Sequence, residues 1–325
     1  MNKLLIPTVL AAAALGGCTN PCPQPTRVDE MARAPGRVDL LFEVTCSDAP
    51  FDSLDASQLR LVEEGVEVSD PDTWVVRRVA DAMPTWSLLL VDVSQTTTID
   101  EETFEAVREG ARLIATSLAE RGEFVGVHMF DGATYLREIS VFTDDPVALS
   151  AALDDFTAED QVDGSSNLHG ALVAGLEQLD AQTASTPASP LVGVGQLIVI
   201  ATDVDRSGRV TASKVTSAMR GSAHGRFVLS VGDQTMADAL SDLAPTHVLW
   251  TDSLDDVAGS TAEDTVELAA SRADSHYLLS YCSPLRSGRA SLEVELTIGE
   301  RSRAVKTTYD TTDFGPGCSL PEAIR

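Results

Sequence analysis

The fold of this chain is decided by residues 87–96, which read SLLLVDVSQT. The first five of these residues form an almost continuously apolar run, which is typical of a strand buried on both faces. Such a strand lies in a parallel sheet, because only a layer of helices on each side can cover both of its rows of side chains. Asp92, Ser94 and Thr96 follow directly, so polar side chains lie where this strand ends.

The residues after this stretch alternate between helix and strand patterns. Residues 100–121 carry apolar side chains at steps of three and four, which predicts a helix with one buried face. Residues 196–202 contain the next strongly apolar run, Leu-Ile-Val-Ile. The alternation predicts the fold class α/β, with a doubly wound, mostly parallel sheet over residues 83–283.

Runs with strand character flank this α/β region on both sides. Residues 37–82 contain three such runs separated by acidic turns, and residues 284–325 contain two more. We therefore expect a small antiparallel β unit beside the parallel sheet, with residues 284–325 packing on residues 37–82.

The amino terminus has the pattern of an export signal. Residues 1–17 contain Lys3, a short apolar run and then small residues, and Cys18 follows. This segment resembles the signal peptide and lipobox of bacterial lipoproteins. The resemblance implies lipidation of Cys18, a membrane contact through the lipid anchor alone, and sorting to the outer membrane of the cell envelope. Residues 18–36 are rich in Pro, Arg and small residues and are expected to form a tether.

Four cysteines remain besides Cys18. An even number in an exported chain favours two disulfides, for which three pairings are possible. Proximity in the sequence favours Cys22–Cys46 and Cys282–Cys318. Metal ligation by thiolates is the alternative, but the sequence has no Cys-x-x-Cys pair.

The charge of the chain restricts its partners. Lys and Arg number 23 against 50 Asp and Glu, which gives a formal net charge of −27 at pH 7. A surface of this kind repels a phosphate backbone, so we expect no nucleic-acid partner.

Two further loops share the composition of residues 92–96. Residues 163–167 read DGSSN and precede a predicted helix, and residues 202–205 read TDVD and follow the second apolar run. In a doubly wound sheet, loops of this kind meet at the carboxyl ends of the strands. They offer carboxylate and hydroxyl oxygens without imidazole or thiol, so we expect a hard cation there, Mg²⁺ or else Ca²⁺ or Mn²⁺.

With these three loops, the α/β region resembles a von Willebrand factor type A domain with a metal-ion-dependent adhesion site. In that family the first loop reads D-x-S-x-S/T, the second supplies a Thr and the third an Asp. Asp92, Ser94 and Thr96 match the first loop, Ser166 replaces the Thr, and Asp203 matches the third. The resemblance implies that the three hydroxyls bind the cation directly and that the two carboxylates act through bound water. It also implies a protein partner whose acidic side chain completes the coordination.

Two positions depart from the family pattern. Val204 follows Asp203 where the family usually has Gly, and Val rarely adopts a positive φ, so this loop is expected to take another conformation. Ser166 keeps the oxygen of Thr but lacks the methyl group that restricts its side-chain rotation.

Three classes of function remain open. A membrane-anchored binding or adhesion protein is favoured, and a metal-free structural or assembly scaffold of the cell envelope is the alternative. Residues 92–96 also resemble the D-x-D-x-T motif of haloacid-dehalogenase-like phosphohydrolases. This third class is less favoured, because Ser94 lies where the general acid should be and cannot protonate a leaving group. We therefore expect no enzymatic activity.

Overall fold

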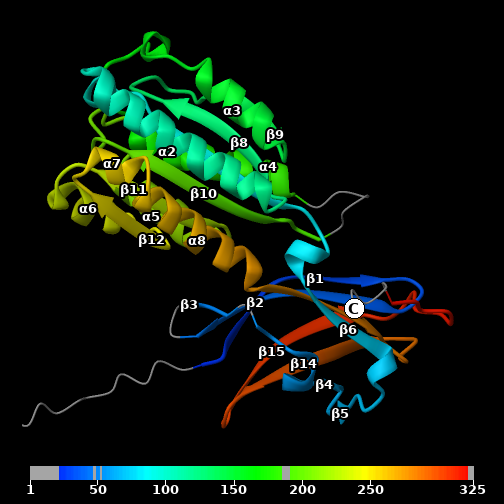
Figure 1. Ribbon diagram of the computed structural model, residues 1–325. Coiled ribbons are helices and arrows are strands. Elements are labelled where there is room, and N and C mark those ends of the chain that lie inside the picture. Colours follow the sequence, from blue (N-terminus) through cyan, green and yellow to red (C-terminus); the bar gives the residue numbers. More distant parts are fainter. Residues whose placement is uncertain (1–21, 47–48, 52, 185–190, 321–325) are drawn as a thin grey trace, which may run out of the picture.

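The structure is a computed structural model that describes residues 22–46, 49–51, 53–184 and 191–320. Figure 1 shows two domains, a sheet layered between helices and a sandwich of antiparallel strands. The described part of the chain starts in the sandwich, forms the whole α/β domain and then returns to the sandwich. Residues 1–17 and Cys18, for which a lipoprotein signal and lipidation are predicted, lie outside the described residues.

The α/β domain is built on a six-stranded sheet with the order β12-β11-β10-β7-β8-β9. All neighbouring strands are parallel except β8 and β9, which are antiparallel. Numbered within the domain, this is the doubly wound order 3-2-1-4-5-6, and the predicted fold class is confirmed. The strands are β7 (Thr85–Asp92), β8 (Phe124–Phe130), β9 (Arg137–Thr143), β10 (Val194–Ala201), β11 (Gly225–Val231) and β12 (His247–Thr251).

Helices cover both faces of this sheet. Side chains of β7 point alternately to either side, so Leu89 and Val91 pack in one core while Leu88 and Leu90 pack in the other. All four are fully buried, which agrees with the apolar run of the sequence. One face carries α2 (Glu101–Glu120), α3 (Pro146–Asp154), α7 (Leu254–Val257) and α8 (Ser260–Asp274), and the other carries α4 (Leu168–Thr183), α5 (Ala212–Gly221) and α6 (Gln234–Ser241). A single turn, α1 (Gln95–Thr98), follows β7.

Two antiparallel sheets form the sandwich, and their facing apolar side chains fill one core. The C-terminal strand β14 pairs with β4, so residues 284–325 do contribute to the same domain as residues 37–82. The first sheet has the order β1-β2-β13-β6, with β3 on β2, and the second has the order β15-β14-β4-β5. The strands are β1 (Gln24–Arg33), β2 (Arg37–Cys46), β3 (Ala49–Pro50), β4 (Leu59–Glu63), β5 (Val66–Glu67), β6 (Trp74–Arg78), β13 (His276–Cys282), β14 (Arg289–Ile298) and β15 (Arg301–Asp310). Short 3₁₀ turns are η1 (Ala56–Gln58), η2 (Pro71–Thr73) and η3 (Val79–Asp81), and a fourth, η4 (Ala158–Asp160), lies in the α/β domain between α3 and α4.

The tether predicted over residues 18–36 is wrong for most of its described part. Residues 24–33 form β1, which pairs with β2 along its whole length. Val28 and Met31 of this strand pack between the two domains. The strand is held by hydrogen bonds to β2 and by these contacts, which local composition does not reveal.

The predicted boundary of the α/β domain at residue 283 is also wrong. The strand β13 does not join the parallel sheet but lies between β2 and β6. Its alternate side chains Tyr277, Leu279 and Tyr281 belong to the core of the sandwich. The α/β domain therefore ends with α8.

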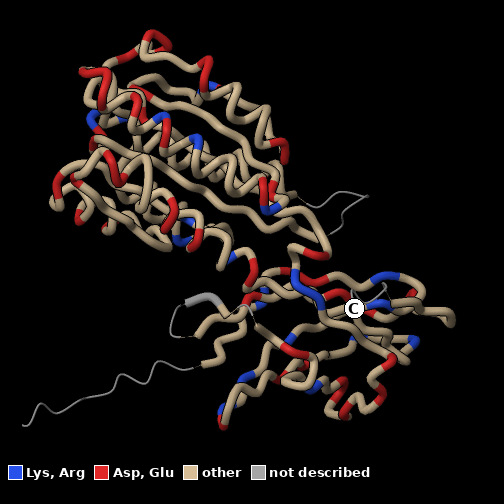
Figure 2. Tube along the Cα trace, viewed as in Figure 1, with Lys and Arg blue, Asp and Glu red and all other residues tan. Residues whose placement is uncertain are grey.

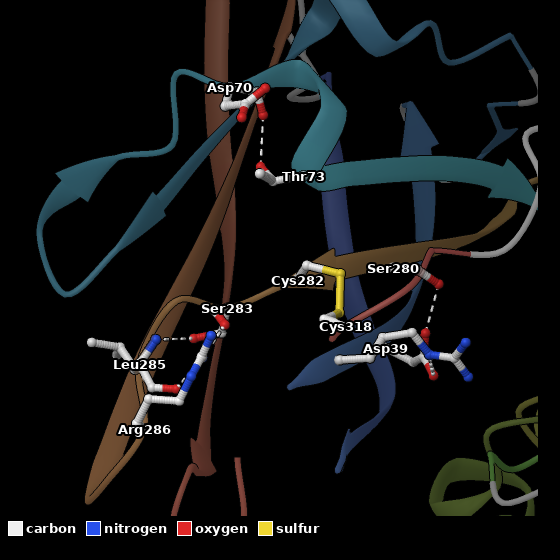
Figure 3. The surroundings of a disulfide bond; sticks show 10 residues. Asp39, Asp70, Thr73, Ser280, Cys282, Ser283, Leu285, Arg286 and Cys318 are labelled. Atoms are coloured by element: carbon white, nitrogen blue, oxygen red, sulfur yellow. Dashed lines mark hydrogen bonds and ion pairs between the residues drawn. A yellow bond between two sulfur atoms is a disulfide. The ribbon is translucent and has the colours of Figure 1, made fainter. Parts of the chain in front are cut away.

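The two favoured disulfides are confirmed. Cys22–Cys46 has a Cα–Cα distance of 4.4 Å and joins the start of β1 to the end of β2. Cys282–Cys318 has a Cα–Cα distance of 5.8 Å and joins the end of β13 to the C-terminal segment (Figure 3). Each closes a loop of a few tens of residues, which stabilises the fold by about 3–4 kcal/mol on the chain-entropy model.

Polar and apolar contacts join the two domains. Leu41 of β2 and Leu278 of β13 pack against Val194 of the parallel sheet. An ion pair of 3.3 Å links Arg272 of α8 to Glu43 of β2. Within the described part of the chain, no helix is both long and apolar enough to cross a bilayer.

Candidate metal centre

The three loops singled out in the sequence lie at the carboxyl edge of the parallel sheet. Asp92 is the last residue of β7, and Asp203 follows the neighbouring strand β10. The chain leaves β7 toward the helices of one face and leaves β10 toward those of the other face. This is the switch point of a doubly wound sheet, where a crevice opens for ligands.

Hydrogen bonds fasten the three loops to one another. The backbone N–H of Gln95 donates to the carbonyl oxygen of Gly164 (2.9 Å), which joins the first loop to the second. The carbonyl oxygen of Ser166 accepts from two backbone N–H groups of the third loop, at 2.9 and 3.0 Å. The hydroxyl of Thr96 donates to Oδ2 of Asp203 (3.1 Å), which joins the first loop to the third. All three loops of the predicted metal site are therefore brought together.

Asp92 is the most deeply buried carboxylate of the site. Its Oδ1 accepts from the backbone N–H of Ser94 (2.8 Å), and its Oδ2 accepts from both the N–H and the hydroxyl of Thr202 (3.1 Å each). Burial raises the pKa of the Asp92 carboxyl above its usual value, against the lowering effect of these hydrogen bonds. A cation beside this carboxylate would reduce the free-energy cost of holding it ionised.

Two hydroxyls of the predicted ligand set are buried without a hydrogen-bond partner. Ser94 is 1% exposed and Ser166 is fully buried, and neither Oγ forms a hydrogen bond of ordinary length and angle among the described residues, although the Ser94 hydroxyl lies near enough to Asp92 to help lower the pKa of that carboxyl. A buried polar group left in this way costs about 1–3 kcal/mol. Ligation of a cation would satisfy both oxygens at once, so the residues present fit a hard divalent ion.

The donor set is rich in hydroxyls and not in acidic groups. Across the described ranges, no group of three or more His, Cys, Asp or Glu side chains has the arrangement of a metal site. The three loops instead offer neutral hydroxyl ligands with two carboxylates, Asp92 and Asp203, nearby. Whether a cation can bind here therefore depends on the hydroxyls of Ser94, Thr96 and Ser166.

Arg206 is a member of this site that the sequence did not predict. Its Nε donates to Oδ2 of Asp203, the same oxygen that accepts from Thr96. This hydrogen bond and the charge of Asp203 raise the pKa of the guanidinium further above its usual value. Asp203 also accepts from the backbone N–H of Val204 (2.8 Å). Among the described residues other than glycine, only two positions elsewhere in the chain have a positive φ, so Val204 fits this loop without backbone strain.

Asp131, at the end of β8, fixes the loop that carries Ser166. The side chain is 1% exposed, and its Oδ2 accepts from the backbone N–H groups of Val162 (2.8 Å) and Asp163 (3.1 Å). Its carbonyl oxygen accepts from the N–H of Asn167 (2.9 Å). The sequence signal was available, because Asp131 follows an apolar strand as Asp92 does.

Asp205 joins the third loop to the start of α4. Its Oδ1 accepts from the backbone N–H of His169 (3.1 Å), and its Oδ2 accepts from that of Gly208 (3.0 Å). The hydroxyl of Ser207 donates to Oδ1 of Asn167 (2.8 Å). These bonds hold the second and third loops in one arrangement.

Comparison with known proteins returns matches only at the level of structure. Neither a family model nor a curated protein matches the sequence. Proximal thread matrix protein 1 from the mussel byssus is 13% identical with a TM-score of 0.48, and the match covers 57% of this chain and 48% of that one. BatB from Bacteroides thetaiotaomicron is 15% identical with a TM-score of 0.41, over 58% of this chain and 100% of that one. The pilus adhesin SpaC from Lactobacillus rhamnosus GG is 12% identical with a TM-score of 0.40, over 91% of this chain and 48% of that one. The chain thus spans about half the length of the mussel protein.

The strand order identifies the fold. The doubly wound order and the antiparallel edge strand β9 have the arrangement of a von Willebrand factor type A fold, with the D-x-S-x-T loop at the switch point. The class that the three loops predicted is confirmed as a fold. The domain is inserted into a β-sandwich, which is formed by the residues on either side of it.

Proposed function

We propose that this protein binds an acidic side chain of a protein partner through a divalent cation at the carboxyl edge of the parallel sheet. Ser94, Thr96 and Ser166 would hold the cation directly, and Asp92 and Asp203 would act through bound water. The observation that carries the proposal is the pair of buried hydroxyls, Ser94 and Ser166, that lack partners among the residues described.

The chemistry of the ligand set explains why an acidic partner fits. Hydroxyl ligands are neutral and do not cancel the charge of the cation, so the ion keeps a strong attraction for one more anionic oxygen. A carboxylate of the partner supplies such an oxygen. The chain carries a net charge of −27 and would otherwise repel acidic partners, so the cation acts as the bridge.

Calorimetric titration of Mg²⁺, Ca²⁺ and Mn²⁺ into the purified ectodomain tests the site. The wild-type protein should bind one cation. Ser94→Ala and Ser166→Ala should each weaken binding by at least about 10- to 100-fold, the range found when even an indirect partner of a metal ligand is removed. Ser165→Ala is the matched control, since the Ser165 hydroxyl already donates to Asp163 (2.9 Å). If the wild-type protein shows no heat of binding and no thermal shift with any of the three cations, the metal site is ruled out.

We also propose that the protein is displayed on the bacterial cell envelope as an outer-membrane lipoprotein anchored through Cys18. The signal pattern of residues 1–17 supports this placement. Metabolic labelling with a fatty acid should mark the wild-type protein and leave Cys18→Ala unmarked and released from the membrane fraction. Equal membrane retention of both proteins would contradict the anchor.

One observation favours the alternative of a metal-free envelope scaffold. The guanidinium of Arg206 already pairs with Asp203, so part of the negative charge of the site is balanced without a cation. Affinity capture from envelope extract separates the two functions, because chelator should release a cation-bridged partner and leave a scaffold contact intact.

A further inference from the structure

We infer that Arg206 is a second anchor for the partner, and that the partner presents two acidic side chains close together in sequence, one for the cation and one for Arg206. This inference rests on the proposed function, because it assigns the first acidic side chain to the cation. It adds a requirement that the metal site alone does not impose.

The guanidinium of Arg206 is fixed at one end and open at the other. Its Nε is held by Asp203, while its Nη1 and Nη2 form no hydrogen bond within the described part of the molecule. The side chain is 63% exposed, so these two nitrogens face solvent. A guanidinium whose plane is already fixed loses little rotational freedom when it binds a carboxylate through two parallel hydrogen bonds.

A cavity of about 430 Å³ adjoins Arg206 and lies within the size range of ligand clefts in proteins. Thr96 and Asp203 line it from the side of the metal site, and Met236 of α6 adds an apolar wall. Asp233 also lines the cavity, but its carboxylate accepts from the backbone N–H of Met236 (3.0 Å). A partner segment therefore has room to pass from the cation to the guanidinium.

The acidic and basic side chains at this edge differ in their exposure to solvent. Asp92 and Asp203 are buried, at 0% and 8% exposure, whereas Arg206 reaches outward. Arg209 lies on the same loop and is 41% exposed, with Asp163 at 3.6 Å. Acidic residues are otherwise spread over both domains (Figure 2). With a cation bound, an acidic partner thus meets the ion and the outward guanidinium of Arg206 side by side, on a protein that elsewhere repels it.

Two capped synthetic peptides of equal length test the inference, one with a single aspartate and one with two aspartates separated by a glycine. Their affinities for the full ectodomain are measured by calorimetry at saturating Mg²⁺. The two-aspartate peptide should bind the wild-type protein about two- to fivefold more tightly, the effect of one ion pair with a solvent-exposed guanidinium. Arg206→Gln should abolish this advantage and still bind Mg²⁺, with equal or higher affinity, because a competing cation has left Asp203.

Arg220→Gln is the charge-matched control, since Arg220 lies in the last turn of α5, away from the carboxyl edge, and its loss should leave the advantage of the two-aspartate peptide unchanged. Three results would overturn the inference while Mg²⁺ binds: equal affinities of the two peptides, an advantage that survives in Arg206→Gln, or no peptide binding at all. A wild-type protein that does not bind Mg²⁺ would instead overturn the proposed function, and the inference with it.

Discussion

Glu63 and Asp92 are buried carboxylates that lie among hydroxyl side chains, one in each domain. In the sandwich, Glu63 is 6% exposed and accepts hydrogen bonds from the hydroxyls of Tyr281 (3.0 Å), Ser283 and Tyr309. Each of the three hydroxyls around this carboxylate is therefore used within the fold. The arrangement stabilises the charge of Glu63 without any ligand.

At the edge of the parallel sheet, the same kinds of groups are arranged differently. Asp92 accepts from Thr202 and from the backbone, while the hydroxyls of Ser94 and Ser166 find no partner in the described part of the chain. Carboxylates beside hydroxyls are thus not sufficient to indicate a metal site. The feature that distinguishes the metal site from the surroundings of Glu63 is a buried hydroxyl oxygen that has no hydrogen-bond partner within the fold.

The largest expected effect comes from removing the hydroxyls around Glu63. The double variant Tyr281→Phe, Tyr309→Phe keeps both rings in the core and deletes two hydrogen bonds to a buried charge. We expect a loss of about 3–5 kcal/mol in the free energy of unfolding, measured with urea, and no change in Mg²⁺ affinity.

The matched double variant is Ser94→Ala, Ser166→Ala, studied without metal. Because these hydroxyls have no partners among the described residues, their removal should relieve the cost of burying them, so the free energy of unfolding should not fall and should rise by about 1–3 kcal/mol per hydroxyl. Equal losses in the two double variants would show that the contrast between Glu63 and Asp92 is not real.

Glu123 provides a third buried carboxylate, at the opposite edge of the parallel sheet. Among the described residues it accepts hydrogen bonds only from Ser87 and Gln196, and burial raises its pKa to about 7. The folded protein therefore binds this proton more tightly than the unfolded chain, so the contribution of Glu123 to stability is highest at low pH and falls as pH rises from about 4.5 to about 7.

Glu123→Gln should remove this pH dependence. Between pH 4.5 and pH 8, wild-type protein should lose about 3 kcal/mol of stability more than the variant does, in urea unfolding at each pH. Parallel curves for the two proteins would show that Glu123 does not titrate in this range.

The sequence predicted the parts of the fold that are set by local pattern. The apolar run before Asp92 gave β7, and the three-and-four spacing gave α2. It failed where pairing over long distances decides the structure, as in β1, which is held by β2, and β13, which lies between β2 and β6. Strand character was evident in β13, but the sheet to which it belongs was not.

The site shows the same division. Ser94, Ser166 and Asp203 were predicted from three separate loops, because strand ends in a doubly wound sheet meet at one edge. Arg206 and Asp131 were missed. The place of Asp131 after an apolar strand was a signal that it lies at the same edge, but the hydrogen bonds between loops that define the roles of both residues follow from no spacing in the sequence.

Asp131→Asn tests whether the second loop must be held for the metal to bind. The variant keeps the shape of the side chain but weakens its hold on the N–H groups of Val162 and Asp163. We expect Mg²⁺ affinity to fall about 10- to 100-fold, as for other residues that orient metal ligands. Asp233→Asn is the control, because Asn caps a helix as well as Asp does. Unchanged affinity in Asp131→Asn would show that the loop is held by its other contacts.

The smallest expected effect concerns Thr307, a buried threonine of β15 in the sandwich. Its hydroxyl, like those of Ser94 and Ser166, has no partner among the described residues, but Thr307 lies in the other domain, remote from the three loops. Thr307→Val replaces the hydroxyl by a methyl group of similar size and should stabilise the fold by up to about 1 kcal/mol, measured by urea unfolding, without any change in Mg²⁺ affinity. A loss of stability greater than 1 kcal/mol would mean that this hydroxyl is satisfied by a buried water. The free oxygens of Ser94 and Ser166 would then need the same explanation, and the metal site would rest on the titrations alone.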